Sequence, residues 1–291
     1  MISFKTAYYS ILAVKINLTK ILKRIYFTTG FYKKTLVSKI PNQFIFFPNP
    51  FLMSSFSNYK KFAFQIKDID PNTFWDQNYS TKEQRELHNF LWLTSIDRKD
   101  NASTLRQIIT LWNIDNLKYK PLVWETSVIS KRIMSWILNS DIILKNCNFD
   151  FKRNFIESII IQTNHLKKNF KFEINNQKKI EILTTIILSG LVFKEYEENY
   201  EYGISELNKL TNSFFDEIGF PVTRNPDDLY IYAKHLLLIR ESIKDAHKYV
   251  PDFLDQTLER NLQCLKNITT PNGSLPLFNG SFETNLSNFY D

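Results

Sequence analysis

The stretch QKKIEILTTIILSGLVF (residues 177–193) carries the strongest helical signal in this chain of 291 residues. Nearly every side chain from Ile180 to Phe193 is apolar, and the charged Lys179 and Glu181 lie at its start. A helix that is apolar on most of its sides is usually buried on most of its sides. We therefore predict a buried helix over about 177–199.

Helical spacing of apolar residues recurs on both sides of this stretch. The further helices are expected over about 81–98, 104–114, 128–142, 150–170, 204–217, 227–246 and 251–267. Thr81 and Gln84 suit a capping box, and Pro251 suits a first helical turn. Helices of this length with short polar loops predict antiparallel helical hairpins, which stack into a solenoid or toroid with a concave face. The expected fold class is mainly all-α.

The composition agrees with a folded helical chain. Hydrophobic residues make up 43% and aromatic residues 15%, which argues against extensive disorder. The chain has only 6 Gly, so a turn-rich all-β fold is not expected. Its two cysteines, Cys147 and Cys264, are too few for a disulfide framework or a Cys-rich metal site. We predict no metal and no cofactor.

Positive charge is concentrated in the first quarter of the chain. Residues 1–67 hold eleven Lys/Arg and no Asp or Glu, whereas the rest holds 26 basic and 30 acidic side chains. The segment ILAVKINLTKILKRIYF (11–27) predicts a basic amphipathic helix, which can pack on the core or bind an anionic membrane through residues 1–39. Only 9 of the 37 basic residues are Arg, which argues against specific nucleic-acid binding.

Targeting signals are weak. The apolar run AYYSILAV (7–14) follows Lys5, but Lys15 comes directly after it and no A-x-A cleavage pattern follows. No stretch reaches the roughly 18 uncharged apolar residues of a membrane-spanning helix. We therefore expect neither a cleaved signal peptide nor a transmembrane helix, and the sequence leaves the choice between cytoplasm and periplasm open.

The segment before the helical series is expected to be irregular. PNQFIFFPNPF (41–51) contains three prolines around an aromatic run, which disfavours helix. FAFQIKDI (62–69) alternates apolar and polar residues, as a short strand does. We divide the chain into a basic N-terminal arm, 1–70, and a helical domain, 71–291.

All five tryptophans lie between residues 75 and 136. Core filling is the ordinary role for a large aromatic side chain, and stacking on a sugar ring is the functional alternative. Trp75 and Trp124, which are expected in loops, are the better candidates for stacking. Trp136 is expected in the middle of a helix and is the better core candidate.

Four short motifs occur in a recognisable order. They comprise Glu86, Leu87, His88, Phe90, Trp92 and Leu93; Pro121, Leu122, Trp124, Arg132 and Trp136; Gly219, Thr223, Arg224, Asn225 and Pro226; and Asn272, Gly273, Leu275, Phe278, Asn279 and Gly280. In this order they resemble the N-terminal half of the bacterial heparinase II/III-like polysaccharide lyases, over about residues 40–282. The resemblance implies an incomplete α/α toroid, which in that family precedes a β-sandwich domain.

The resemblance also implies β-elimination on an acidic, uronate-containing polysaccharide such as a glycosaminoglycan or alginate. Such a site neutralises the uronate carboxylate, removes the C5 proton and protonates the leaving oxygen. The family's Asn-His pair falls here on Gln177 and Lys178, and its Tyr or His on Pro221, which cannot transfer a proton. The sequence stops at Asp291, where the β-sandwich and its His would begin, so that domain is expected on a longer or separate chain, unless the function has changed.

The candidate residues follow from these positions. As catalytic candidates we take Tyr230, Tyr232 and Lys178, and as substrate-binding candidates Gln177, Arg224, Asn225, Trp124, Trp75, His88 and Arg132. Ordinary packing is the alternative for the tyrosines and for His88, a cap and turn for Arg224 and Asn225, and a buried ion pair for Arg132. The expected function is binding of an acidic polysaccharide in a helical groove, with or without cleavage. The rival is a membrane-surface protein that acts through the basic arm.

Overall fold

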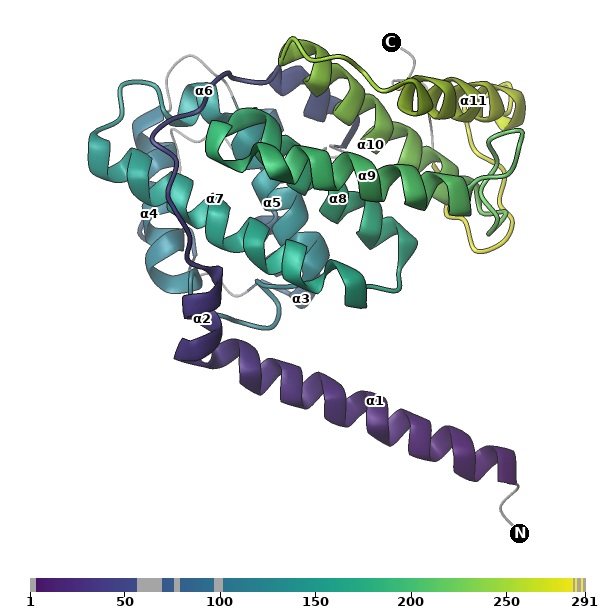
Figure 1. The fold of residues 1–291 in the computed structure, drawn as a ribbon, viewed down its shortest axis with the longest axis horizontal. Coiled ribbons are helices and arrows are strands. Elements are labelled where there is room, and N and C mark those ends of the chain that lie inside the picture. The colour runs from purple at the N-terminus through teal and green to yellow at the C-terminus, as the bar shows by residue number, and fades with distance from the viewer. Residues whose placement is uncertain are drawn as a thin grey trace.

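The computed structural model describes residues 4–56, 70–75, 79–96 and 102–284, together with residues 286 and 289. Within these ranges nearly all of the regular secondary structure is helical, and the one isolated β-bridge joins Phe215 to Pro221. Figure 1 shows a layered body of helices with one long helix projecting from it. The expectation of a mainly all-α fold is confirmed.

The helices have the following bounds. They are α1 (Phe4–Thr28), α2 (Gly30–Leu36), η1 (Pro50–Phe56), α3 (Thr81–His88), η3 (Leu91–Ser95), α4 (Ala102–Asn116), α5 (Thr126–Leu138), α6 (Ser140–Ile143), α7 (Phe149–Asn169), η4 (Phe170–Phe172), α8 (Asn176–Val192), η5 (Lys194–Tyr196), α9 (Glu197–Phe214), α10 (Pro226–Asp245) and α11 (Asp252–Ile268), where η marks a 3-10 helix.

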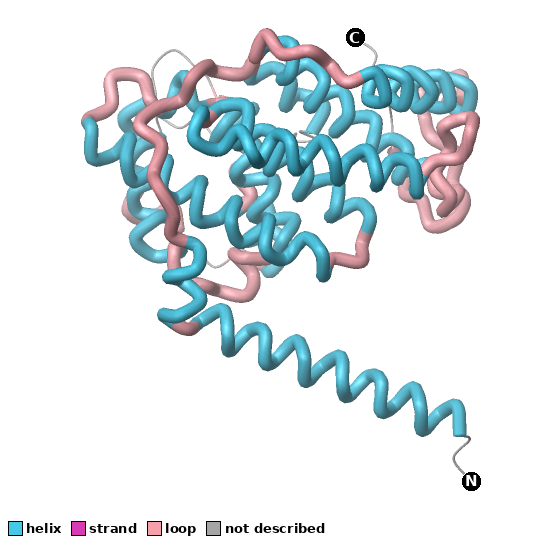
Figure 2. Tube along the Cα trace, in the orientation of Figure 1, coloured by secondary structure: helices cyan, strands magenta, loops and turns pink. Residues whose placement is uncertain are grey.

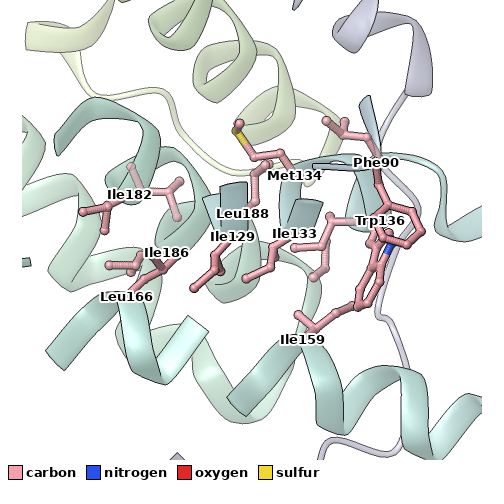
Figure 3. Packing of buried hydrophobic residues seen from close by; sticks show 14 of the residues in the cluster. Phe90, Ile129, Ile133, Met134, Trp136, Ile159, Leu166, Ile182, Ile186 and Leu188 are labelled. Carbon is pink, nitrogen blue, oxygen red and sulfur yellow. The ribbon is translucent and has the colours of Figure 1, made fainter. Parts of the chain in front are cut away.

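Helix α8 forms the centre of the body. Each of its residues from Ile180 to Val192 is buried, as its apolar sequence predicts. It packs against α5, α7, α9 and α10. Figure 3 shows the close packing of Ile129 and Ile133 from α5, Ile159 and Leu166 from α7, and Ile182, Ile186 and Leu188 from α8. Burial of each such side chain contributes about 1.5–3 kcal/mol, so this region supplies much of the driving force for folding.

Helices α8, α9 and α10 establish the topology. Gln177 of α8 bonds to Asp228 of α10, and Thr184 bonds to His235, and in both pairs the partners are separated by 51 positions in the sequence. A constant separation means that α8 and α10 run in the same direction. The intervening α9 returns antiparallel along α8, to which it packs closely. At Gly190, a Cβ atom would lie 2.1 Å from the backbone nitrogen of Tyr200, so only glycine permits this approach.

The helix predicted over 81–98 is shorter and begins differently. Its capping box is formed by Ser80 and Glu83, one residue earlier than Thr81 and Gln84. The helix ends at His88, and Phe90 follows with a φ of 58°, a left-handed conformation that cannot continue a helix. The chain then enters η3, which the spacing of apolar residues alone does not distinguish from a continued helix.

Four other boundaries differ from expectation. The helix predicted over 128–142 stops at Leu138, and Asn139 separates it from α6. The helix predicted over 177–199 ends at Val192, because η5 makes a tight turn there. Consequently α9 begins at Glu197 rather than near residue 204. Pro251 is the N-cap of α11 and not part of its first turn.

The N-terminal region contributes to the same core. Residues 37–49 have no helix, and Phe44 is buried with its ring 4.7 Å from that of Phe193. Met53 in η1 is fully buried. The strand expected over 62–69 lies outside the described residues, and the division of the chain at residue 70 stays a prediction. Among the described helices, none combines the length and apolarity needed to cross a bilayer.

Candidate functional site

The first turns of α8 and α10 lie beside each other at one end of the body. Asn175 caps α8, because its side chain accepts a 3.0 Å hydrogen bond from the backbone N–H of Lys178. Asn225 caps α10 in the same way with Asp227, at 2.8 Å. Pro226 follows as the first helical residue, a position where its missing N–H costs nothing. The cap predicted as the alternative role of Asn225 is therefore present.

Polar side chains of α5, α8 and α10 form three pairs, which are Lys131 with Glu181, Gln177 with Asp228, and Lys234 with Tyr230. The charges of Lys131 and Glu181 act on Lys234, which links two of these pairs. We call this group the α8–α10 site, and it comprises Lys131, Gln177, Glu181, Asp228, Tyr230 and Lys234. The amide Nε2 of Gln177 donates to Asp228 at 2.7 Å, and the Thr223 hydroxyl donates to the other oxygen of that carboxylate at 2.6 Å. Asp228 therefore fixes the orientation of the Gln177 amide. The second N–H of that half-buried amide is left to donate to another group.

Glu181 is a buried carboxylate with one engaged oxygen. Its Oε1 lies 3.2 Å from Nζ of Lys131 on α5. Its Oε2 is buried and accepts no hydrogen bond from the described residues. A buried charged oxygen in this state is costly, since it has lost water and gained nothing in return. It can accept a hydrogen bond from water or from a ligand.

Lys234 is the second cation of the site. Its ammonium nitrogen lies 4.2 Å from the ring centroid of Tyr230 and 5.2 Å from that of Phe56. Burial, together with the positive charge of Lys131, lowers the pKa of Lys234 to about 8, although Glu181 and Asp227 offset part of the shift. It forms no ion pair with any residue that the structure describes. Lys234 can therefore exchange a proton near neutral pH.

Tyr230 completes the chemical inventory. Its side chain is half-buried, and burial raises the pKa of its phenol above the ordinary value of 10. The phenol thus keeps its proton while the neighbouring Lys234 can lose one. A pair of groups whose environments separate their pKa values is the arrangement that general acid–base catalysis requires. The site holds an amide donor, a proton acceptor and a proton donor.

Arg224 lies beside the site and is already paired. It has a φ of 55°, and its guanidinium donates to Asp216 at 2.6 Å. Its carbonyl oxygen accepts from the side chain of Asn279 at 2.9 Å. The arginine side chain is still about half exposed. The turn role predicted as its alternative is present, and contact with a glycan stays a prediction.

Two of the predicted catalytic residues have different surroundings. Tyr232 is fully buried, its hydroxyl donates to the backbone oxygen of Asn176 at 3.0 Å, and burial raises its pKa. Its ring stacks on Phe214 at 4.5 Å. The prediction that Tyr232 acts as an acid or base is therefore wrong, because no substrate can reach it. Lys178 is exposed in the first turn of α8, where it can contact an anionic ligand.

Arg132 and Trp124 belong to a separate, buried network. The guanidinium of Arg132 is fully buried and donates to Gln162 Oε1, at 2.7 and 2.5 Å, and to the carbonyl oxygens of His88 and Val123. The indole N–H of Trp124 donates to a backbone oxygen, and only 4% of the residue is exposed. Neither side chain can contact a sugar, so both substrate-binding predictions are corrected. The structure also corrects the expected ion pair of Arg132, since its partners are neutral.

Trp75 and His88 border the same network. Their rings stack with centroids 5.3 Å apart, and the Trp75 indole donates to the backbone oxygen of Ile108. His88 accepts a hydrogen bond from Trp112 at 3.0 Å, and burial lowers its pKa to about 3. Both residues keep some exposed surface. Their contact with a glycan stays a prediction, whereas their packing role is evident.

Four residues of the α8–α10 site escape the sequence interpretation, namely Lys131, Glu181, Asp228 and Lys234. Lys131, Glu181 and Lys234 each interrupt an apolar helix face. A charge within a run such as YIYAKHLLL (230–238) is the available signal, because charged side chains are seldom buried and a buried one often belongs to a functional site. The sequence alone does not reveal that the charges at these three positions, on three helices, act on one another.

Comparisons with known proteins identify the fold. A comparison with protein families found no match, and none of the curated proteins matches the sequence. Among solved structures, the chain is similar to the heparan sulfate lyase HepC from Pedobacter heparinus, with a TM-score of 0.56 and 18% identity over 73% of this chain and 36% of that chain. It is also similar to a heparinase III, with a TM-score of 0.54 and 17% identity over 82% and 42% of the two chains.

A structure of the same heparinase III with methylated lysines gives a TM-score of 0.53. These likenesses confirm the helical fold that the sequence motifs imply. The chain spans well under half the length of these lyases.

Proposed function

We propose that the α8–α10 site binds an acidic, uronate-containing polysaccharide and cleaves it by β-elimination. The observation that carries the proposal is the pair formed by Lys234 and Tyr230, in which a lysine whose pKa is lowered to about 8 contacts a phenol whose pKa is raised. The likeness of the fold to a heparan sulfate lyase and a heparinase III supports the choice of substrate class. At the position where the resemblance implies an acid or base, this chain has Pro221. In the proposal, Lys234 and Tyr230 of the α8–α10 site supply those groups instead.

In this proposal Gln177 and the lysines neutralise the uronate carboxylate. Asp228 holds the Gln177 amide, whose free N–H donates to the carboxylate of the sugar. Lys131 and the exposed Lys178 supply positive charge nearby. Partial neutralisation of that carboxylate makes the C5 proton acidic enough to be removed, because the carbanionic charge spreads onto an oxygen that is already stabilised.

The proton transfers are assigned to Lys234 and Tyr230. The neutral amine of Lys234 takes the C5 proton, and the electron pair of that bond forms a double bond between C4 and C5. The bond from C4 to the leaving oxygen breaks, and the phenol of Tyr230 protonates that oxygen. The products are an unsaturated uronate and a new chain end, with no change in oxidation state overall.

A non-catalytic glycan-binding domain is the second candidate. It is favoured by Pro221, which occupies the position where the resemblance implies a Tyr or His. Under this alternative the amide and the lysines hold the polysaccharide, and Lys234 never accepts a proton from it.

The experiment offers heparin, heparan sulfate, hyaluronan and alginate to the purified chain. Retention on immobilised glycan and the ultraviolet absorbance of the unsaturated product are measured for the wild type, Lys234→Met and Lys266→Met. Lys266 is an exposed lysine of α11 and serves as the matched control. We expect retention and product from the wild type and from Lys266→Met, and no product from Lys234→Met. Retention without product would favour the binding domain, and neither signal would refute both functions.

A further inference from the structure

The N-terminal helix α1 extends away from the body, as Figure 2 shows. Its C-terminal end is anchored, because the ring of Phe27 lies 5.2 Å from that of Tyr119 and 5.1 Å from that of His165. Nζ of Lys23 also lies 4.4 Å from the ring centroid of Phe172. The helix is therefore held at one end and presents its remaining length to the surroundings.

The described part of α1 exposes a continuous apolar stripe. Between 52% and 67% of each residue in this stripe is exposed, and its members are Val14, Leu18, Ile21, Leu22 and Ile25. Their spacing of three and four residues places them on one side of the helix. Exposure of several large aliphatic side chains to water is unfavourable, at about 25 cal/mol per Å² of apolar surface. A contiguous stripe of this kind indicates a surface that becomes covered.

The positive charge of α1 indicates which kind of partner can cover its apolar stripe. The sequence of α1 contains Lys5, Lys15, Lys20, Lys23 and Arg24 and no acidic residue. A second copy of the helix would bring two sets of five positive charges together with no carboxylate to pair them, which is repulsive. An anionic bilayer offers both an apolar interior for the stripe and negative headgroups for the lysines.

The adjoining helix α2 repeats this combination on a smaller scale. Phe31 and Val37, at its two ends, are 70% and 51% exposed, and Lys33 and Lys34 between them are exposed as well. The whole segment 1–67 carries eleven positive and no negative side chains. Basic and apolar groups thus continue from α1 into the first residues that pack on the body.

We propose that α1 binds the surface of an anionic phospholipid bilayer, with its apolar stripe inserted among the acyl chains and its lysines on the headgroups. In this proposal α1 lies in the plane of the membrane–water interface. It does not cross the bilayer, since none of the described helices is long and apolar enough to do so. The body, which contacts the C-terminal end of α1, remains in the aqueous phase in this proposal. This binding is independent of the α8–α10 site and of any glycan.

The test is co-sedimentation of the full chain with vesicles of phosphatidylcholine alone and of phosphatidylcholine with phosphatidylglycerol. The wild type is expected to bind the anionic vesicles, to bind neutral ones weakly, and to be released by salt. Leu18→Glu combined with Leu22→Glu should weaken the partition by roughly a hundredfold, since two inserted leucines are replaced by repelled carboxylates. Phe149→Glu is the control, because Phe149 is 73% exposed at the far end of α7.

Circular dichroism checks that each variant keeps its helices, which is expected because the substituted side chains are exposed. The proposal would be overturned if the wild-type protein did not co-sediment with anionic vesicles at low salt. Binding that the double variant leaves unchanged would do so too. A third outcome would be no vesicle binding together with a wild-type dimer in light scattering that the two substitutions convert to a monomer. This outcome would overturn the proposal and assign the stripe to a second copy of the chain.

Discussion

Replacement of Lys234 by methionine should make the protein more stable at neutral pH. The pKa of this lysine is about 8 in the fold, compared with an ordinary value of 10.5. Below both values the fold therefore holds a charge that it disfavours, and the difference of about 2.5 pKa units corresponds to about 3 kcal/mol. Methionine keeps the apolar stem without the charge. The variant also loses the contact between the ammonium and two aromatic rings, which lowers its free energy of unfolding by about 1 kcal/mol. A net gain of about 2 kcal/mol in the free energy of unfolding is therefore expected at pH 7.

The sign of the pH dependence gives a second check. Between pH 8 and pH 10.5 the unfolded chain binds a proton at Lys234 that the folded chain has released, so the stability of the wild type rises with pH in this window. The gain from Lys234→Met should therefore shrink by about 2 kcal/mol between pH 7 and pH 10.

The assay is urea unfolding of the wild type, Lys234→Met and the exposed control Lys266→Met at both pH values. The control should change the free energy of unfolding by less than about 0.5 kcal/mol. A variant at Lys234 that is less stable than the wild type at pH 7 would refute the reasoning. An equal gain in the free energy of unfolding at both pH values would refute it as well. Such a gain could not come from the removal of a buried charge, whose cost depends on pH.

Three further outcomes are expected. Gly190→Ala should lower the free energy of unfolding by about 3 kcal/mol in urea titration, because the new Cβ atom meets the backbone of α9 at 2.1 Å; a loss below about 1 kcal/mol would contradict the packing of α8 on α9. Tyr230→Phe should slow elimination about a hundredfold in the product assay, whereas Tyr232→Phe should leave that rate unchanged and cost about 1 kcal/mol of stability; equal effects on the rate would remove Tyr230 from its assigned role. Burial lowers the pKa of His165 to about 3, so the unfolded chain alone gains this proton as the pH falls below 6.5, and the wild type should lose about 2 kcal/mol more than His165→Phe between pH 7 and pH 5; parallel losses would show that His165 is not buried as a neutral group.

The helical framework can be predicted largely from the sequence because its signals are local. The apolar run from Ile180 to Val192 is buried in α8 as expected, and α7, α10 and α11 begin and end within one or two residues of the predicted bounds. The errors arise where the chain breaks a periodic pattern without glycine or proline. The left-handed Phe90 is one example, and the break at Asn139 is another.

The candidate site is predicted only in part, because it depends on contacts between distant segments. The motif positions include Gln177, whose amide bonds to Asp228 and whose contact with a substrate stays a prediction. They also include Asn225, whose alternative role as a helix cap is confirmed. They also lead to Arg132 and Trp124, whose chemistry suits a ligand site but whose side chains fill the core. The burial that lowers the pKa of Lys234 comes from neighbours on other helices, which helical spacing within one segment cannot reveal.

The rate of unsaturated uronate formation as a function of pH tests the central claim most directly. With Lys234 as the base, the rate should rise with pH to a plateau with a midpoint near pH 8, because only the neutral amine accepts the C5 proton. The same profile should disappear in Lys234→Met and persist in Lys266→Met. An absence of product from every acidic polysaccharide at all pH values, or a profile that Lys234→Met leaves unchanged, would contradict the assignment of the α8–α10 site as a lyase centre.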